Sequence, residues 1–263
     1  MKFSKIIYSV EDGVATILLN CEKNRNAFDA RMIDELSEAL ELAGADDGVR
    51  CLLIASNGTA FSSGGDVFDM YEGVCHNTID FKASFQQVAS LTKKIKLMPK
   101  PVIAAVRGYA AGGGFMLALA ADYTIAATDA KFTAAFVHIG LIPDCGGLFL
   151  MRNSLGLGRA VELAMTGRTV CADEAQRLGM AARVVPVEEL LDEAKKQARS
   201  FAAGPKEAYA EMKALVYKHL FAGFDAYLDD EIESQLRCSA SDDFKARVTG
   251  FVSQHAKAKS RVQ

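Results

Sequence analysis

Residues 101–127, which read PVIAAVRGYAAGGGFMLALAADYTIAA, combine two apolar runs with a glycine-rich turn between them. The run Pro101–Val106 predicts a buried strand, and Tyr123–Ala127 predicts another. Between them, Gly108–Gly114 predicts a turn, and the apolar segment Phe115–Ala121 predicts a helix. Strands that alternate with helices in this way are typical of α/β proteins with a mainly parallel or mixed sheet.

The chain before this stretch continues the same pattern. Val14–Leu19 and Cys51–Ala55 predict two strands, and the second is expected to be covered on both faces because it is apolar throughout. Asp29 is predicted to cap a helix over residues 30–43. A further helical period covers residues 79–98.

The chain after Gly146 is predicted to be mainly helical. Gly204-Pro205 interrupts the helical pattern, since proline lacks the amide that a helix interior needs. We therefore predict an α/β core over residues 1–204 and an appended helical segment over residues 205–263. The segments with helical periodicity are residues 158–166, 172–178, 187–203, 205–220 and 224–239.

The composition is that of a soluble globular protein, because half of the 263 residues are hydrophobic and 24% are charged. The net charge of −3 offers no broad attraction to nucleic acid or anionic lipid. Arg107 and Asp122 interrupt the most apolar region, so we predict no membrane-spanning segment. The N-terminal residues are too polar for a secretory signal.

The cysteines and histidines argue for an intracellular protein without a metal site. The six cysteines form no C-x-x-C pair, so they are expected to be reduced thiols, which indicates the cytoplasm. The four histidines show no ligand spacing.

Two glycine turns follow two of the predicted strands: Phe61–Asp66 (FSSGGD) and Arg107–Gly114 (RGYAAGGG). Backbone amides at such turns point outward and attract negative charge. Neither turn continues as a P-loop or as a G-x-G-x-x-G motif, which disfavours nucleotide binding. Tight packing explains either turn alone; two amides aimed at one oxygen would instead form an oxyanion hole.

Together, several stretches resemble the enoyl-CoA hydratase/isomerase (crotonase) superfamily, and the match runs nearly end to end. The resemblance implies a spiral of β-β-α units with a C-terminal helical segment that builds homotrimers or hexamers. It also implies an acyl-CoA thioester as the substrate, with no separate cofactor. The matching stretches are Leu19-Asn20, Asn26-Ala27, Phe61–Asp66, Lys100–Gly114, Gly140–Gly147, Thr166–Arg168, Ala172, Glu174-Ala175, Leu178-Gly179 and Leu228–Glu231.

The resemblance also implies roles for individual residues. The amides of Gly65 and Gly113 would form the oxyanion hole, and Cys21 departs from the family's pattern near the CoA phosphates. The residues that the resemblance places along the CoA moiety are Ser63, Gly65 and Val67 near the adenine, and Lys23 or Arg25 near the phosphates.

Asp144 is the residue on which the reaction type depends. From the residues alone, Pro143-Asp144 before two glycines is compatible with a helix cap. Family hydratases use two glutamates at positions that are Met116 and Phe136 here, so their mechanism is not expected. Family isomerases, including one group of Δ3,Δ2-enoyl-CoA isomerases and the ring-epoxyphenylacetyl-CoA isomerase, carry their acid at position 144. The resemblance therefore implies that Asp144 is a catalytic base that moves a double bond.

Other polar residues have simpler expected roles. His138 is predicted to pack on an apolar strand, Asp66 to form a turn or cap, and Cys145 to fill the core. Asp69 and Glu72 are minor candidates for a second acid.

Three other functions stay open at this stage. The chain could be an enoyl-CoA hydratase, a hydrolase of the same family, or a non-catalytic relative that binds acyl-CoA or RNA. The acidic balance of the chain disfavours RNA.

Overall fold

A computed structural model describes residues 3–260 and contains two sheets. The larger sheet has the strand order β1-β2-β3-β4-β6-β9, in which only β1 is antiparallel to its neighbour. The smaller sheet has the order β5-β7-β8. The strands are β1 (Ile6–Glu11), β2 (Val14–Leu19), β3 (Cys51–Ser56), β4 (Val102–Val106), β5 (Tyr109–Ala111), β6 (Tyr123–Ala127), β7 (Lys131–Thr133), β8 (Thr169–Cys171) and β9 (Arg183–Val185).

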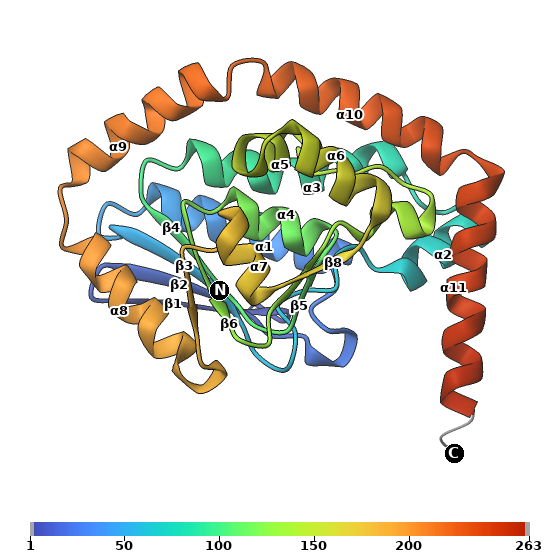
Figure 1. Cartoon of the computed structure of the whole chain (residues 1–263), viewed down its shortest axis with the longest axis horizontal. Helices are drawn as coiled ribbons and strands as arrows, with labels where there is room; N and C mark the ends of the chain where they lie inside the picture. Colours follow the sequence, from blue (N-terminus) through green and yellow to red (C-terminus); the bar gives the residue numbers. More distant parts are fainter. Residues whose placement is uncertain (1–2, 261–263) are drawn as a thin grey trace.

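Both faces of the larger sheet are covered, as the unbroken apolar strands predict. Successive side chains of a strand point to opposite faces. On β3, Leu52 and Ile54 therefore join the core beneath α1, α3 and α4, while Leu53 packs with Leu190 of α8 on the other face. This arrangement confirms the α/β prediction (Figure 1).

The helices of the first half agree with the sequence in part. The side chain of Asp29 accepts a hydrogen bond from Met32 N and caps the first helix, as predicted. The period over residues 79–98 corresponds to a single helix, but the helix before it was not predicted. These helices are α1 (Ala30–Ala45), α2 (Val67–His76), α3 (Phe81–Leu97) and α4 (Gly113–Ala120).

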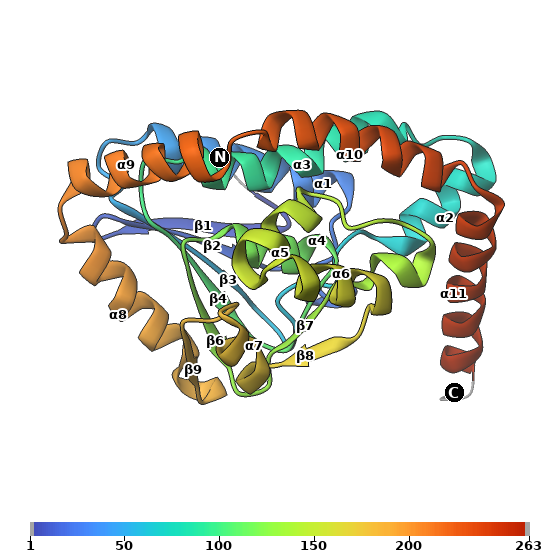
Figure 2. The ribbon, with the colours of Figure 1, turned by 45° about the horizontal axis from the view of Figure 1, so that its top comes forward.

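The second half is mainly helical, as predicted. In Figures 1 and 2, α9 and α10 run along one side of the core, and α11 turns away to pack against α2. Within residues 3–260, no helix is both long and apolar enough to cross a membrane. The division at residue 204 stays a prediction. The helices are α5 (Gly147–Leu155), α6 (Leu157–Thr166), α7 (Ala172–Leu178), α8 (Leu190–Ala202), α9 (Lys206–Leu215), α10 (Phe224–Ser239) and α11 (Asp242–Ser260).

Candidate active site

The two glycine turns lie side by side. Ser62 N donates to Tyr109 O at 3.0 Å, and Ala111 N donates to Ser62 O at 2.9 Å. At Gly64, whose φ is +80°, a Cβ atom would lie 2.6 Å from Ala111 O and 3.2 Å from Gly113 N. Only glycine permits so close an approach, and tight packing therefore explains part of the glycine pattern.

The backbone amides of Gly65 and Gly113 are free to donate hydrogen bonds to a ligand. Neither amide donates a hydrogen bond to any part of the chain that the structure describes. Both residues line the same cavity of about 640 Å³. Gly113 is also the first residue of α4, whose dipole favours negative charge at this end. The pair is thus suited to bind an oxygen that gains negative charge.

Asp144 lines this first cavity and does not cap a helix. The N-cap of α5 is Gly146, with no side-chain hydrogen bond, so the helix-cap alternative is wrong. One carboxylate oxygen of Asp144 accepts from Cys145 Sγ at 3.0 Å, and the other accepts from Gln235 Nε2 at 3.4 Å. Burial raises the pKa of Asp144 to about 6, although both hydrogen bonds act in the opposite direction.

Helix α10 holds the loop that carries Asp144. The buried Gln235 side chain accepts from Ile142 N at 3.0 Å and donates to Ile142 O at 3.1 Å. The buried Glu231 carboxyl group accepts from Gly146 N at 2.8 Å and from Gly147 N at 3.0 Å. Burial raises the pKa of Glu231 to about 8. These contacts fix both sides of the loop and therefore the position of Asp144.

The positions of the two hydratase glutamates carry no acid. Phe136 is buried in the wall of the first cavity, 3.7 Å from where a Cβ of Gly112 would lie. Met116 is fully buried behind Gly147. Since neither side chain can exchange a proton, Asp144 has no glutamate partner at these positions.

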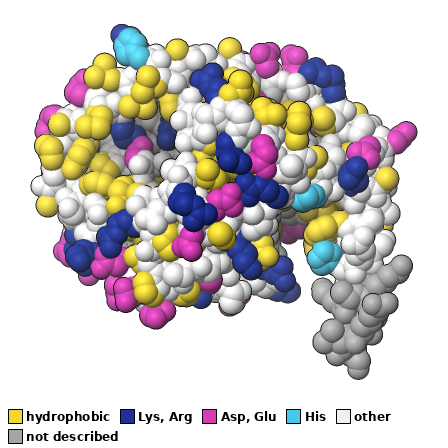
Figure 3. Space-filling model, in the orientation of Figure 1, with side chains coloured by type: hydrophobic (Ala, Val, Ile, Leu, Met, Phe, Trp, Pro, Cys, Tyr) yellow, Lys and Arg dark blue, Asp and Glu magenta, His cyan; other side chains and the backbone are white. Residues whose placement is uncertain are grey.

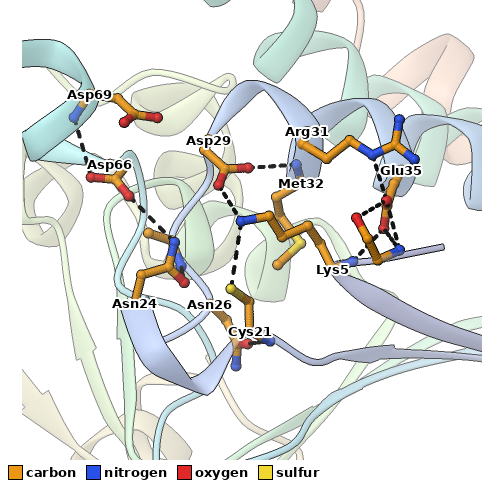
Figure 4. Close-up of polar contacts among 12 residues, drawn as sticks. Lys5, Cys21, Asn24, Asn26, Asp29, Arg31, Met32, Glu35, Asp66 and Asp69 are labelled. Atoms are coloured by element: carbon orange, nitrogen blue, oxygen red, sulfur yellow. Dashed lines mark hydrogen bonds and ion pairs between the residues drawn. The ribbon is translucent and has the colours of Figure 1, made fainter. Parts of the chain in front are cut away.

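Four other carboxylates line the first cavity: Glu72, which pairs with His76 at 3.2 Å, and the three that Figure 4 shows. Asp29 caps α1 and pairs with Lys5 at 2.7 Å. Asp66 accepts from the amides of Phe68 and Asp69, which confirms its predicted role as a cap. Burial and the nearby Asp66 raise the pKa of Asp69, which lies on α2. Its possible role as a second acid stays a prediction.

The residues predicted along the CoA moiety are only partly brought together. Ser63, Val67 and Arg25 line the first cavity. Lys23 belongs to a short helical turn, Glu22–Asn24, and does not line it. Of the two predicted phosphate partners, only Arg25 therefore lies at the cavity.

The prediction of a strand around His138 is wrong. Residues Ala135–Ile139 form a 3₁₀ helix, which ends where Gly140 adopts a φ of +76°. His138 Nε2 lies 2.9 Å from Gly167 O, so the ring has a hydrogen-bond partner. The expected core role of Cys145 is confirmed, because the residue is buried and burial raises the pKa of its thiol.

The sequence interpretation missed three contributions to the site. Phe251 and His255 of α11 line the first cavity, far along the chain from the other lining residues. Glu231 stands within the stretch Leu228–Glu231 that resembles the family, and no sequence motif includes Gln235. Their spacing of four residues on one face of α10 was an available signal, because polar residues on a buried helix face need partners.

Comparisons with known proteins show which family this chain is similar to. The family model described as enoyl-CoA hydratase/isomerase matches residues 9–259. The chain is 36% identical over 255 residues to a trans-2-decenoyl-[acyl-carrier-protein] isomerase of Streptococcus mutans, covering 95% of this chain and 96% of that protein. It is 36% identical over 252 residues to a 1,2-epoxyphenylacetyl-CoA isomerase of Escherichia coli, with the same coverage.

The fold is also similar to solved structures. A crystal structure of an enoyl-CoA hydratase from Mycobacterium avium subsp. paratuberculosis superimposes with a TM-score of 0.87 at 28% identity. The match covers 96% of this chain and 97% of that one, which confirms the expected crotonase fold. Isomerases and hydratases thus both occur among the proteins to which this chain is similar.

Proposed function

This chain belongs to the enoyl-CoA hydratase/isomerase family, and we propose that it moves a carbon–carbon double bond within an enoyl thioester. One observation carries the proposal: the Asp144 carboxylate lies in the same cavity as two unpaired amides, while Met116 and Phe136 occupy the hydratase positions. A double-bond shift needs a single group that takes a proton and returns it elsewhere. Hydration needs a further group to activate water.

In the proposed reaction, the thioester oxygen accepts hydrogen bonds from Gly65 N and Gly113 N. The Asp144 carboxylate removes a proton from C2 of a 3-enoyl thioester, and the electron pair spreads into a dienolate. The protonated Asp144 then returns the proton to C4, so that the double bond lies between C2 and C3 and the thioester is restored. One such amide donor typically contributes about 100- to 1000-fold to the rate.

The surroundings of Asp144 suit both halves of this cycle. A pKa of about 6 leaves the group ionised at neutral pH, yet it makes the group a better proton acceptor than an exposed aspartate. The apolar side chains of Phe136 and Leu141 line the same cavity and limit competing attack by water. The substrate would be a small-molecule acyl thioester, and the reaction would require no cofactor and no metal.

The acyl group would lie against the part of the cavity wall between α2 and α3, where several apolar side chains line the cavity. Ile79, Phe81, Phe85 and Val88 lie there. This lining favours an unsubstituted chain or an aromatic group over a hydroxylated one. Arg25 at the cavity would assist the phosphates of CoA.

A product analysis on the purified full chain tests this proposal. We would incubate the enzyme with 3-decenoyl-CoA and with 2-decenoyl-CoA, and with the same acyl groups on an acyl carrier protein. Liquid chromatography against authentic standards separates the 2-enoyl and 3-enoyl isomers and so detects migration, while mass spectrometry detects hydration as the addition of one water. We expect migration, and partial retention of a deuterium label moved from C2 to C4. Hydration alone, release of free thiol, or tight binding without turnover would each favour one of the other functions.

We also propose a homotrimer or hexamer. Leu157 and Met165 on α6 are 66% and 74% exposed, and such apolar side chains are typical of surfaces that a second copy covers. Analytical ultracentrifugation measures the assembly, and a monomer at micromolar concentration would refute this proposal.

A further inference from the structure

A second cavity of about 580 Å³ lies between α9 and the larger sheet. It shares no lining residue with the first cavity. Figure 3 shows it as a hollow on the left, rimmed by hydrophobic atoms, with basic and acidic side chains deeper inside. A hollow of this size can bury most of a small organic molecule.

The walls of the second cavity are mostly apolar, and only three lining residues are charged: Lys96, Lys213 and Asp122. Lys213 Nζ contacts Asp122 Oδ2 at 2.5 Å and also donates to two backbone carbonyl oxygens. The Lys213–Asp122 pair therefore has no net charge, and all three hydrogens of the Lys213 ammonium group have acceptors. The apolar and aromatic lining residues are Leu119, Leu150, Met180, Phe201, Val216 and Phe221.

Lys96 differs from Lys213 because its ammonium group has no partner of opposite charge. Lys96 Nζ makes no hydrogen bond among the side chains and backbone described for residues 3–255, and it lies over the ring of Phe221, 5.2 Å from the centroid. Burial lowers its pKa to about 8; Asp122 opposes this effect and Lys213 adds to it. With Lys96, Lys213 and Asp122 ionised, the second cavity carries one net positive charge beside mostly apolar walls, and the half-buried Lys96 has no hydrogen-bond partner for it.

We propose that the second cavity binds a small amphipathic anion, namely a monocarboxylate on an apolar body, with the carboxylate on Lys96. Such a ligand supplies the single negative charge that neutralises Lys96. Its apolar body would lie against Phe201, Val216 and Phe221. An inorganic phosphate fits less well, because it would gain no apolar contact and would bring more charge than Lys96 balances. This site is independent of the proposed reaction.

Isothermal titration calorimetry on the full chain tests the site with octanoate and with 1-octanol, which has the same chain length but no charge. We expect Lys96→Met to weaken octanoate binding about 10- to 100-fold, the range for a hydrogen bond to a charged group. Lys96→Arg keeps the positive charge, so its affinity for octanoate should stay within about threefold of that of the parent. Lys94→Met is the matched control, because Lys94 lies on α3 but pairs with Glu41 outside the second cavity.

Two results would overturn the proposal. One is octanoate affinity that is the same in Lys96→Met and in the parent, since any binding in the first cavity does not involve Lys96. The other is 1-octanol binding that is as tight as octanoate and equally sensitive to Lys96→Met. Thermal unfolding provides a check on folding. Without ligand, Lys96→Met should unfold at the parent temperature or a few degrees above it, because a half-buried charge without a hydrogen-bond partner has been removed.

Discussion

Asp144 in the first cavity and Lys96 in the second are both ionisable groups among apolar walls, yet only Asp144 has hydrogen-bond partners for its charged form. Burial moves both pKa values toward neutrality, to about 6 and about 8. Asp144 accepts from Cys145 and Gln235, whereas Lys96 contacts only an aromatic ring.

The difference indicates how each cavity uses its charge. The partners of Asp144 belong to the fold, so its carboxylate is positioned before any substrate arrives, as a catalytic group requires. Among the described residues, the anion near Lys96 is Asp122, which pairs with Lys213 and makes no hydrogen bond to Lys96. Burial alone therefore does not identify a reactive group; the number of fixed partners distinguishes a positioned acid from a site that awaits a ligand.

The largest expected effect comes from removing the carboxylate of the first cavity. Asp144→Asn keeps the shape of the side chain but removes the base, so we expect kcat for double-bond migration to fall about 100- to 10,000-fold. Steady-state kinetics by liquid chromatography measure this loss. Asp66→Asn is the matched control, because Asp66 also lines the first cavity but caps α2, and its kcat should fall less than about tenfold. If kcat falls equally in the two variants, Asp144 is not the catalytic base.

The next largest effect is a difference in unfolding free energy between substitutions of the two lysines in the second cavity. Lys213→Met removes the donor to the carbonyls of Ile95 and Lys100 and the charged partner of Asp122, which keeps only Val102 N, and we expect a cost of about 2–4 kcal/mol in unfolding free energy. Lys96→Met breaks no hydrogen bond. Urea unfolding, followed by circular dichroism, compares the two variants. A similar loss in both would show that Lys96 has a partner in solution.

A smaller effect is expected where α10 holds the loop of the first cavity. Glu231→Ala leaves the buried amides of Gly146 and Gly147 without an acceptor, at a cost of about 1–3 kcal/mol. The exposed Glu233→Ala on the same helix should change the unfolding free energy by less than about 0.5 kcal/mol. Urea titrations of both variants measure the difference. If Glu231→Ala is as stable as Glu233→Ala, the loop does not depend on this contact.

The strands show which parts of the fold could be predicted from the sequence. β4 is an unbroken apolar run, and β3 and β6 each contain a single hydroxyl residue, Ser56 and Thr124, besides Tyr123, so their burial was evident from composition alone. The strand β5 could not be predicted in this way, because Tyr109–Ala111 lies within a glycine-rich stretch. It forms a strand only by pairing with β7 and Ser62. Such pairing depends on segments that are distant in sequence, and local pattern does not reveal it.

The candidate site follows the same rule. Asp144 and the two glycines stand in motifs that are visible in sequence. The contributions of Gln235 and Glu231 depend on contacts across 91 and 85 residues, so only the fold reveals them. The incorrect strand at His138 has a local cause, because a short apolar run does not distinguish a strand from a tight helical turn.

The smallest expected effect concerns the pKa of Asp144 itself. The proposed base must be ionised, so kcat should fall as the pH drops below about 6, where the carboxylate becomes protonated. Gln235 donates to the ionised form and thereby lowers the pKa of Asp144. Gln235→Met removes that donor, so the pKa should rise and the acidic limb of the rate profile should move to higher pH.

The size of this shift is expected to stay below about one pH unit, since one unit corresponds to about 1.4 kcal/mol and the 3.4 Å contact is long. Rate profiles from pH 5 to about pH 9 measure the shift, because general base catalysis reports the pKa of the essential group. Gln86→Met on α3 makes the same exchange at an exposed site outside the first cavity and should leave the limb in place. A loss of stability in Gln235→Met without any movement of the limb would mean that Gln235 only supports the loop at Ile142.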